Sequence, residues 1–166
     1  MVTRRRVLGG AALGSLALGG AGFALLGGFG SSRADARRYE LVLSDAEWRR
    51  RLSPAQYRIL RRSGTDLPFA SPYNHETRRG TYLCAGCALP LYPSSTKYDS
   101  GTGWPSFWKP LPGAIVTLPD RSLGFERTET VCRRCGGHIG HVFDDGPPPT
   151  GKRYCMNGNA LTFVPA

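Results

Sequence analysis

Five cysteines are the residues of this chain whose type and spacing could do chemistry. Four of them form two Cys-x-x-Cys pairs, Cys84 with Cys87 and Cys132 with Cys135. Two tight turns of this kind can bring four thiolates to one tetrahedral zinc ion at about 2.3 Å. Four sulfur ligands leave no coordination position for water or substrate, so the spacing predicts a structural Zn²⁺ as the cofactor. Two disulfide bonds are the alternative.

Cys155 is the fifth cysteine and lies outside both pairs. A lone cysteine in such a chain is either an inert buried thiol or a nucleophile, and its neighbours decide between the two. Arg153 stands two residues before it, and His138 and His141 follow the second cysteine pair. Cationic and proton-donating groups favour a thiolate and can hand a proton to a leaving oxygen. The residues alone leave both roles of Cys155 open.

Four separated segments carry a family resemblance. They are residues 80–87 (GTYLCAGC), 97–107 (KYDSGTGWPSF), 137–147 (GHIGHVFDDGP) and 153–157 (RYCMN). In type and order they resemble the B-type methionine sulfoxide reductases, or peptide-methionine (R)-S-oxide reductases, over about residues 39–164. The resemblance implies an oxidoreductase that reduces the R epimer of methionine sulfoxide within damaged proteins.

The resemblance also implies roles for polar residues of this chain. Cys155 resembles the catalytic cysteine that attacks the sulfoxide sulfur and becomes a sulfenic acid. His141 and Asn157 resemble the groups that hold the sulfoxide oxygen. His138 and Arg153 are expected close by, as part of the substrate-binding site.

Two aromatic residues are expected to form the substrate pocket. Trp104 resembles the indole that packs against the substrate methyl group, and an aromatic face is a good partner for a polarisable S-methyl group. Phe143 could be a second wall of the pocket. Without the surrounding motifs, ordinary core packing would be the simpler interpretation of both residues.

Thr102 is where the chain departs from part of the family. Many members carry a second, resolving cysteine at this position of the Ser-Gly-x-Gly-Trp-Pro motif. With four cysteines on zinc, no free thiol remains to close a disulfide with Cys155. The sulfenic acid must then be reduced by an external thiol, either a thioredoxin-fold reductase or a small thiol.

Residues 1–36 have the pattern of an export signal. Residues 3–8 (TRRRVL) match a twin-arginine motif, and residues 7–30 carry no charge. The small-x-small sequence at 34–36 predicts cleavage there, leaving residues 37–166 as the catalytic domain in a periplasmic or other extracytoplasmic compartment. An uncleaved single-span anchor is the alternative, and the membrane is expected to be contacted through this segment only. Because the twin-arginine route carries folded proteins, zinc could be bound before export.

The net charge of +10 includes +3 from residues 1–36, which leaves +7 on the mature chain. Arginines cluster at 49–51, 61–62 and 78–79. No nucleic-acid motif accompanies these clusters, so no nucleic-acid partner is expected. A zinc-ribbon-like binding module with a basic face is the alternative function. We expect the chain to be a monomer.

The remaining pattern predicts the elements that position these residues. Ser44 and Glu47 form a capping box that predicts a helix to about Leu52, and Pro54 begins a second helix that ends near Arg62. Strands are predicted at 82–83, 89–92, 114–118, 123–131, 138–143 and 160–164. Helices first and strands afterwards predict one mainly antiparallel, β-rich domain with short N-terminal helices. The family resemblance implies two packed sheets.

Overall fold

The computed structural model describes residues 39–166, so the predicted export signal lies outside the described residues. Two helices come first, α2 (Asp45–Arg51) and α3 (Pro54–Arg62). The strands that follow are β1 (Gly80–Cys84), β2 (Pro90–Pro93), β3 (Lys97–Tyr98), β4 (Ser106–Phe107), β5 (Ile115–Asp120), β6 (Arg127–Cys132), β7 (His138–Phe143), β8 (Arg153–Met156) and β9 (Leu161–Pro165). Three short 3₁₀ helices lie at Pro72–Asn74, Ser94–Thr96 and Gly158–Ala160. Within residues 39–166, no helix has the length and apolar character needed to cross a membrane.

Both α-helices begin with the reciprocal hydrogen bonds of a capping box. The backbone N–H of Ser44 donates to the Glu47 carboxylate at 2.8 Å, and the N–H of Glu47 donates to the Ser44 hydroxyl at 3.3 Å. Ser53 and Gln56 repeat the arrangement at the start of α3. Because these bonds satisfy N–H groups that have no partner inside the helix, they fix both helix starts. The predicted helices are confirmed.

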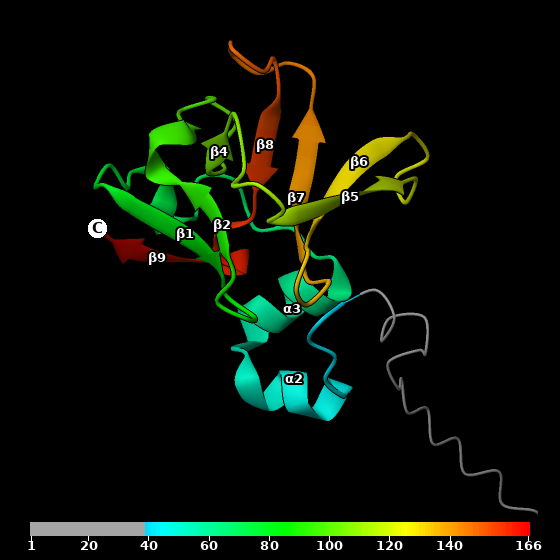
Figure 1. Cartoon of the computed structure of the whole chain (residues 1–166). Helices are drawn as coiled ribbons and strands as arrows, with labels where there is room; N and C mark the ends of the chain where they lie inside the picture. Colours follow the sequence, from blue (N-terminus) through cyan, green and yellow to red (C-terminus); the bar gives the residue numbers. More distant parts are fainter. Residues whose placement is uncertain (1–38) are drawn as a thin grey trace, which may run out of the picture.

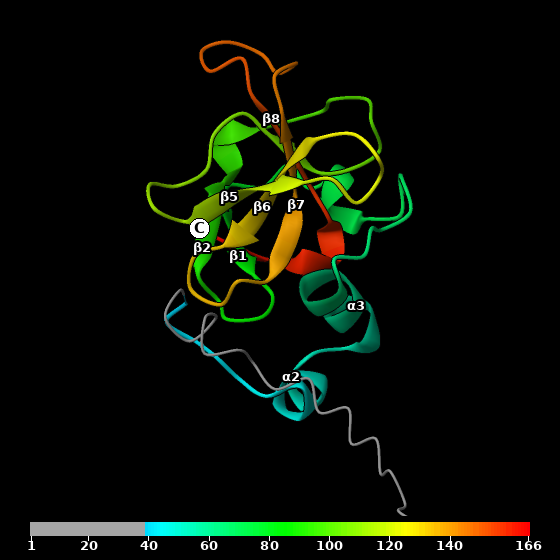
Figure 2. The same ribbon diagram turned by 90° about the vertical axis from the view of Figure 1, so that its right-hand side faces the viewer.

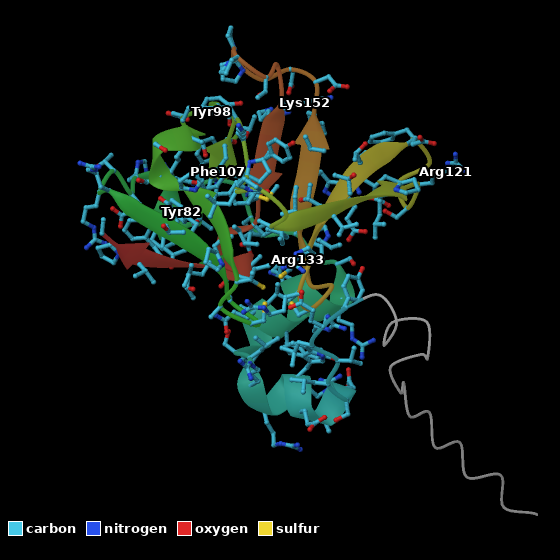
Figure 3. All side chains as sticks on the ribbon, viewed as in Figure 1. Tyr82, Tyr98, Phe107, Arg121, Arg133 and Lys152 are labelled. Carbon is cyan, nitrogen blue, oxygen red and sulfur yellow. The ribbon has the colours of Figure 1, made fainter. Side chains whose placement is uncertain are left out.

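The strands form two antiparallel sheets. The smaller sheet has the order β2-β1-β9, and the larger has the order β3-β4-β8-β7-β6-β5. Figures 1 and 2 show the helices at one end of these sheets. Aromatic rings join the sheets: the ring centroid of Phe107 in β4 lies 5.0 Å from that of Tyr82 and 4.4 Å from that of Tyr92. Phe107 and Tyr82 are labelled in Figure 3. The predicted β-rich, mainly antiparallel two-sheet architecture is confirmed.

Four strands differ from the sequence-based expectation: β6 begins later than expected, and β3, β4 and β8 are not predicted, the first two being only two residues long. The strand expected at 123–131 begins only at Arg127, because a turn closed by the N–H of Gly124 on the carbonyl of Arg121 precedes it. Gly124 has φ of 82° in this turn. The sequence does not predict β8, whose residues Arg-Tyr-Cys-Met show no apolar alternation. β8 exists because β4 and β7 pair with it on either side.

Candidate active site and metal centre

The four paired cysteines converge at two hairpin turns. Cys84 ends β1 and Cys87 lies in the turn to β2, while Cys132 ends β6 and Cys135 lies in the turn to β7. All four are buried, and their sulfur atoms lie within 4.8 Å of one another. The Sγ atoms of Cys84 and Cys135 are 3.7 Å apart, and those of Cys87 and Cys132 are 3.5 Å apart. Sulfurs on a tetrahedral zinc ion lie about 3.8 Å apart, whereas a disulfide needs about 2.05 Å. The cluster is therefore suited to zinc and does not fit two disulfides.

The two turns share one backbone geometry. The residue after each second cysteine, Ala88 or Gly136, donates its N–H to the carbonyl of the first cysteine at 2.8 Å. Both residues have left-handed backbones, with φ of 57° and 66°. At Gly136 a Cβ atom would lie 2.4 Å from the ring of Tyr39, so this position also requires the absence of a side chain.

Arginines from the predicted basic clusters hold these turns. Arg51 donates to the carbonyl of Gly86 at 2.8 Å, and Arg61 donates to the carbonyl of Cys135 at 3.1 Å. Figure 1 shows both cysteine turns beside α3. The packing of the helices thus uses two of the clustered arginines. Because these two arginines bond to the cysteine turns, they weaken the alternative function, a binding module with a basic face.

Cys155 lies on β8, opposite Ser106 of β4 and His141 of β7 in the strand register. A cavity of about 130 Å³ opens at this point. The residues that line it are Thr65, Trp104, Arg127, Gly140, His141, Phe143, Cys155, Met156 and Asn157. The fold therefore gathers the predicted residues Trp104, His141, Phe143, Cys155 and Asn157 into one cavity.

The Cys155 thiol is half-buried at the end of a chain of hydroxyl groups. Its Sγ lies 3.9 Å from Oγ1 of Thr102, which is 2.8 Å from Oγ of Ser100, which in turn is 2.7 Å from Oγ of Ser106. Burial raises the pKa of Cys155, and the Thr102 hydroxyl, the Arg153 charge and the Ser106 hydroxyl offset only part of this effect. The sequence leaves open whether the neighbours of Cys155 favour a thiolate, and in the structure the desolvation of the thiol outweighs them. The resting group is a thiol.

His141 is held by an ion-paired carboxylate. Its Nε2 lies 2.8 Å from Oδ2 of Asp120, and Arg127 donates to the same oxygen at 2.6 Å. Burial lowers the pKa of His141 and outweighs the opposing hydrogen bond to Asp120. The backbone N–H of Ser122, together with His141, lowers the pKa of Asp120, which is therefore ionised. Because a carboxylate only accepts, the proton of the neutral imidazole belongs on Nε2, and Nδ1 remains an acceptor.

Asn157 lines the cavity, and its side-chain amide is hydrogen-bonded to two backbone groups of the protein. Its Oδ1 accepts the N–H of Asp66 at 2.8 Å, and its Nδ2 donates to the carbonyl of Ile139 at 3.1 Å. Nε2 of His138 lies 3.5 Å from Nδ2 of Asn157, and Nδ1 of His138 lies 2.6 Å from Glu129. His138 is buried behind Asn157 and is not among the residues that line the cavity. Its geometry is that of a residue that positions Asn157.

The two aromatic walls are each fixed by a polar contact. The indole N–H of Trp104 donates to the carbonyl of Asp66 at 3.0 Å. The guanidinium of Arg153 lies 4.3 Å from the centroid of the Phe143 ring and forms a two-pronged ion pair with Asp145 at 2.9 and 2.8 Å. Arg153 does not line the cavity. It supports Phe143 from outside.

Several residues of the site carry no signal in the sequence. Asp66 bonds to Asn157 across 91 residues of sequence. Asp120 contacts His141 across 21 residues, and Glu129 contacts His138 across 9. Strand pairing brings Asp120 and Glu129 to their histidines, whereas Asp66 reaches Asn157 from the loop after α3. Ser100 and Ser106 lie inside a motif already singled out, but their contacts with each other appear only in three dimensions.

The fold and the site define a class of protein: a small β-rich domain in which one accessible thiol stands apart from a four-cysteine cluster, as in thiol-dependent redox enzymes. The SelR domain family matches residues 52–165. Proteins named peptide methionine sulfoxide reductase MsrB are similar along most of their length. The Agrobacterium fabrum protein is 54% identical over 123 residues, covering 74% of this chain and 91% of its own. The Leptospira interrogans protein is 51% identical over 126 residues, covering 75% and 96%. The chain belongs to the MsrB family of oxidoreductases.

Thr102→Val tests the hydroxyl chain at the thiol. Because the Thr102 hydroxyl lowers the pKa of Cys155, its removal raises that pKa and reduces the thiolate fraction near pH ~7.5. We expect iodoacetamide to alkylate Cys155 about five-fold more slowly, the equivalent of one hydrogen bond. Thr102→Ser is the matched control and should alkylate like the wild type. An unchanged rate in Thr102→Val, read by peptide mapping, would contradict this interpretation.

Proposed function

We propose that this chain reduces methionine (R)-sulfoxide in oxidised proteins to methionine, with Cys155 as the nucleophile. The observation that carries the proposal is the position of Cys155, outside the four-cysteine cluster and in a cavity with Trp104 and Phe143. The names of the relatives support methionine sulfoxide reduction. Aromatic walls suit the S-methyl group of the substrate.

The chemical step is an oxygen transfer between two sulfur atoms. Cys155 Sγ attacks the sulfoxide sulfur, the S–O bond to methionine breaks, and the oxygen ends on Cys155 as a sulfenic acid. Two electrons pass from Cys155 to methionine, and the thiol hydrogen ends on the transferred oxygen. His141 lines the same cavity, and its acceptor nitrogen Nδ1 would take the thiol proton and return it to the oxygen. Asn157 holds the cavity wall in place.

The test is turnover of both epimers of N-acetyl-methionine sulfoxide with dithiothreitol. We expect the wild type to reduce the R epimer only, and Cys155→Ser to lose activity by about 10³-fold or more without loss of fold. Turnover by Cys155→Ser would show that another group is the nucleophile. Equal turnover of the S epimer would overturn the stereochemical assignment.

We infer that the four-cysteine cluster holds one structural Zn²⁺. Cys84, Cys87, Cys132 and Cys135 would supply four thiolates, which leaves the metal no position for substrate. Bound there, the ion would supply coordination bonds between the two hairpin turns. The sulfur separations described above support this inference.

Cys132→Ser tests the zinc inference. Zinc binding contributes on the order of 10 kcal/mol in small zinc peptides, which is comparable with the whole stability of a domain. We therefore expect the variant to contain no zinc and to be largely unfolded by circular dichroism, whereas Cys155→Ser keeps one zinc per chain and its fold. A Cys132→Ser protein with unchanged metal content and melting temperature would refute the site.

We propose that an external thiol, from a thioredoxin-fold protein or a small molecule, reduces the sulfenic acid. Two thiols are oxidised to a disulfide, and one water leaves. Two observations support this proposal. The other four cysteines lie together in the cluster. The Thr102 hydroxyl lies 3.9 Å from Cys155 Sγ, at the position where many family members have the resolving cysteine.

Thr102→Cys tests that proposal. The introduced sulfur would stand close to Cys155, and a disulfide requires Cα atoms within about 7 Å. With one equivalent of substrate and no reductant, we expect the variant to form a disulfide between the introduced thiol and Cys155. The wild type should form no intramolecular disulfide, by mass spectrometry of the unreduced digest. A wild-type link between Cys155 and a cluster cysteine would overturn the proposal.

We also propose export of the folded chain by the twin-arginine route, with cleavage after Ala36 and action as a monomer. The sequence of residues 1–36 supports the export route and the cleavage site. Arg4→Lys combined with Arg5→Lys should retain the protein in the cytoplasm. Normal export of the double variant would refute the route, and the N-terminal sequence of exported wild type reports the cleavage site.

A further inference from the structure

The loop beside the cavity displays two apolar side chains to solvent. Leu67 and Phe69 are 76% and 69% exposed, the highest values among the large apolar residues of the described chain. Thr65, two residues before Leu67, lines the cavity that contains Cys155. We call Leu67 and Phe69 the apolar rim. Adjacent exposed apolar side chains next to a cavity are typical of a binding surface.

The backbone of this loop is fixed on both sides. The N–H of Phe69 donates to the carbonyl of Gly103 at 2.6 Å, and Trp104 donates to the carbonyl of Asp66 at 3.0 Å. The Asp66 N–H donates to Asn157 at 2.8 Å, as described for the cavity wall. The rim is therefore held by the residues that form the cavity, and its exposure is not that of a loosely attached loop.

Phe69 adopts a backbone conformation that a bulky residue rarely takes. Its φ is 64°, in the left-handed region that favours glycine and asparagine. A second cavity of about 80 Å³, lined by Phe69, Gly103 and Trp104 among others, lies at this side of Trp104. The N–H of Ala70 donates to the carbonyl of Leu67 at 3.3 Å and closes the turn in which Phe69 takes this conformation. A left-handed backbone at a bulky residue is characteristic of functional positions.

We propose that the apolar rim, together with the part of Trp104 that lines the second cavity, binds an apolar side chain that neighbours the oxidised methionine in the substrate polypeptide. This inference rests on the proposed function. A cavity of about 130 Å³ accepts the end of one side chain, so the rest of the substrate chain lies across its edge. Trp104 lines both cavities and thus connects the two positions. In an extended chain, residues two apart face the same side, so the apolar residue is two positions from the methionine.

The experiment compares hexapeptides that contain methionine (R)-sulfoxide in a Gly/Ser background, with Leu or Ser two positions away on either side. With dithiothreitol as reductant, we expect kcat/KM of the wild type to be about ten-fold higher for one of the Leu peptides than for its Ser counterpart. Phe69→Asn keeps the left-handed backbone and should reduce this ratio to about two-fold. Its turnover of N-acetyl-methionine (R)-sulfoxide should be unchanged.

Leu123→Asn is the matched control, because Leu123 is 61% exposed in the turn between β5 and β6 and lines neither of the two cavities. It should keep the preference for Leu. Equal rates for Leu and Ser peptides in the wild type, or an unchanged ratio in Phe69→Asn, would overturn the inference. A defect of Phe69→Asn confined to assays driven by thioredoxin would assign the rim to the reductant and also overturn it. Failure of the wild type on N-acetyl-methionine (R)-sulfoxide would instead overturn the proposed function.

Discussion

The convergence of four buried sulfur atoms is the constraint on which the rest of the structure depends. Cys84 and Cys87 belong to the hairpin of the smaller sheet, and Cys132 and Cys135 belong to the hairpin of the larger sheet. The cluster therefore joins the two sheets at their turns, while the rings of β1, β2 and β4 join them along their faces. β7 begins three residues after Cys135 and pairs directly with β8 at Cys155. One strand, β7, therefore connects the cluster to the cavity.

The same constraint divides the cysteines by chemistry. Four are buried among other sulfurs, and the fifth lies in a cavity with Trp104, His141 and Phe143. Neither the thiol nor the imidazole in this cavity carries a resting charge, because burial raises the pKa of Cys155 and lowers that of His141. A thiol that keeps its proton beside an imidazole that can accept one is suited to a step in which that proton ends on the transferred oxygen.

The sequence predicts those parts of the structure that depend on local patterns. The Cys-x-x-Cys pairs predict the convergence at the cluster, and Ser44 with Glu47 predicts the first helix, because both signals span only four residues. β8 has no such pattern, and its strand conformation comes from its neighbours on both sides. The role of Asp66 likewise cannot be predicted from the sequence, because its contact with Asn157 spans 91 residues. The family motifs led to the cavity residues, but only the structure separates Asn157, which lines the cavity, from His138 behind it.

The measurement that tests the central claim most directly is the location of the sulfenic acid after one turnover. The purified chain would receive one equivalent of N-acetyl-methionine (R)-sulfoxide with dimedone and no reductant, followed by digestion and mass spectrometry. If Cys155 is the nucleophile and the other four cysteines bind metal, we expect one dimedone adduct per chain. It should lie on the peptide that contains Cys155, with the cluster cysteines unlabelled. Adducts on Cys84, Cys87, Cys132 or Cys135, or methionine formed without any adduct, would contradict it.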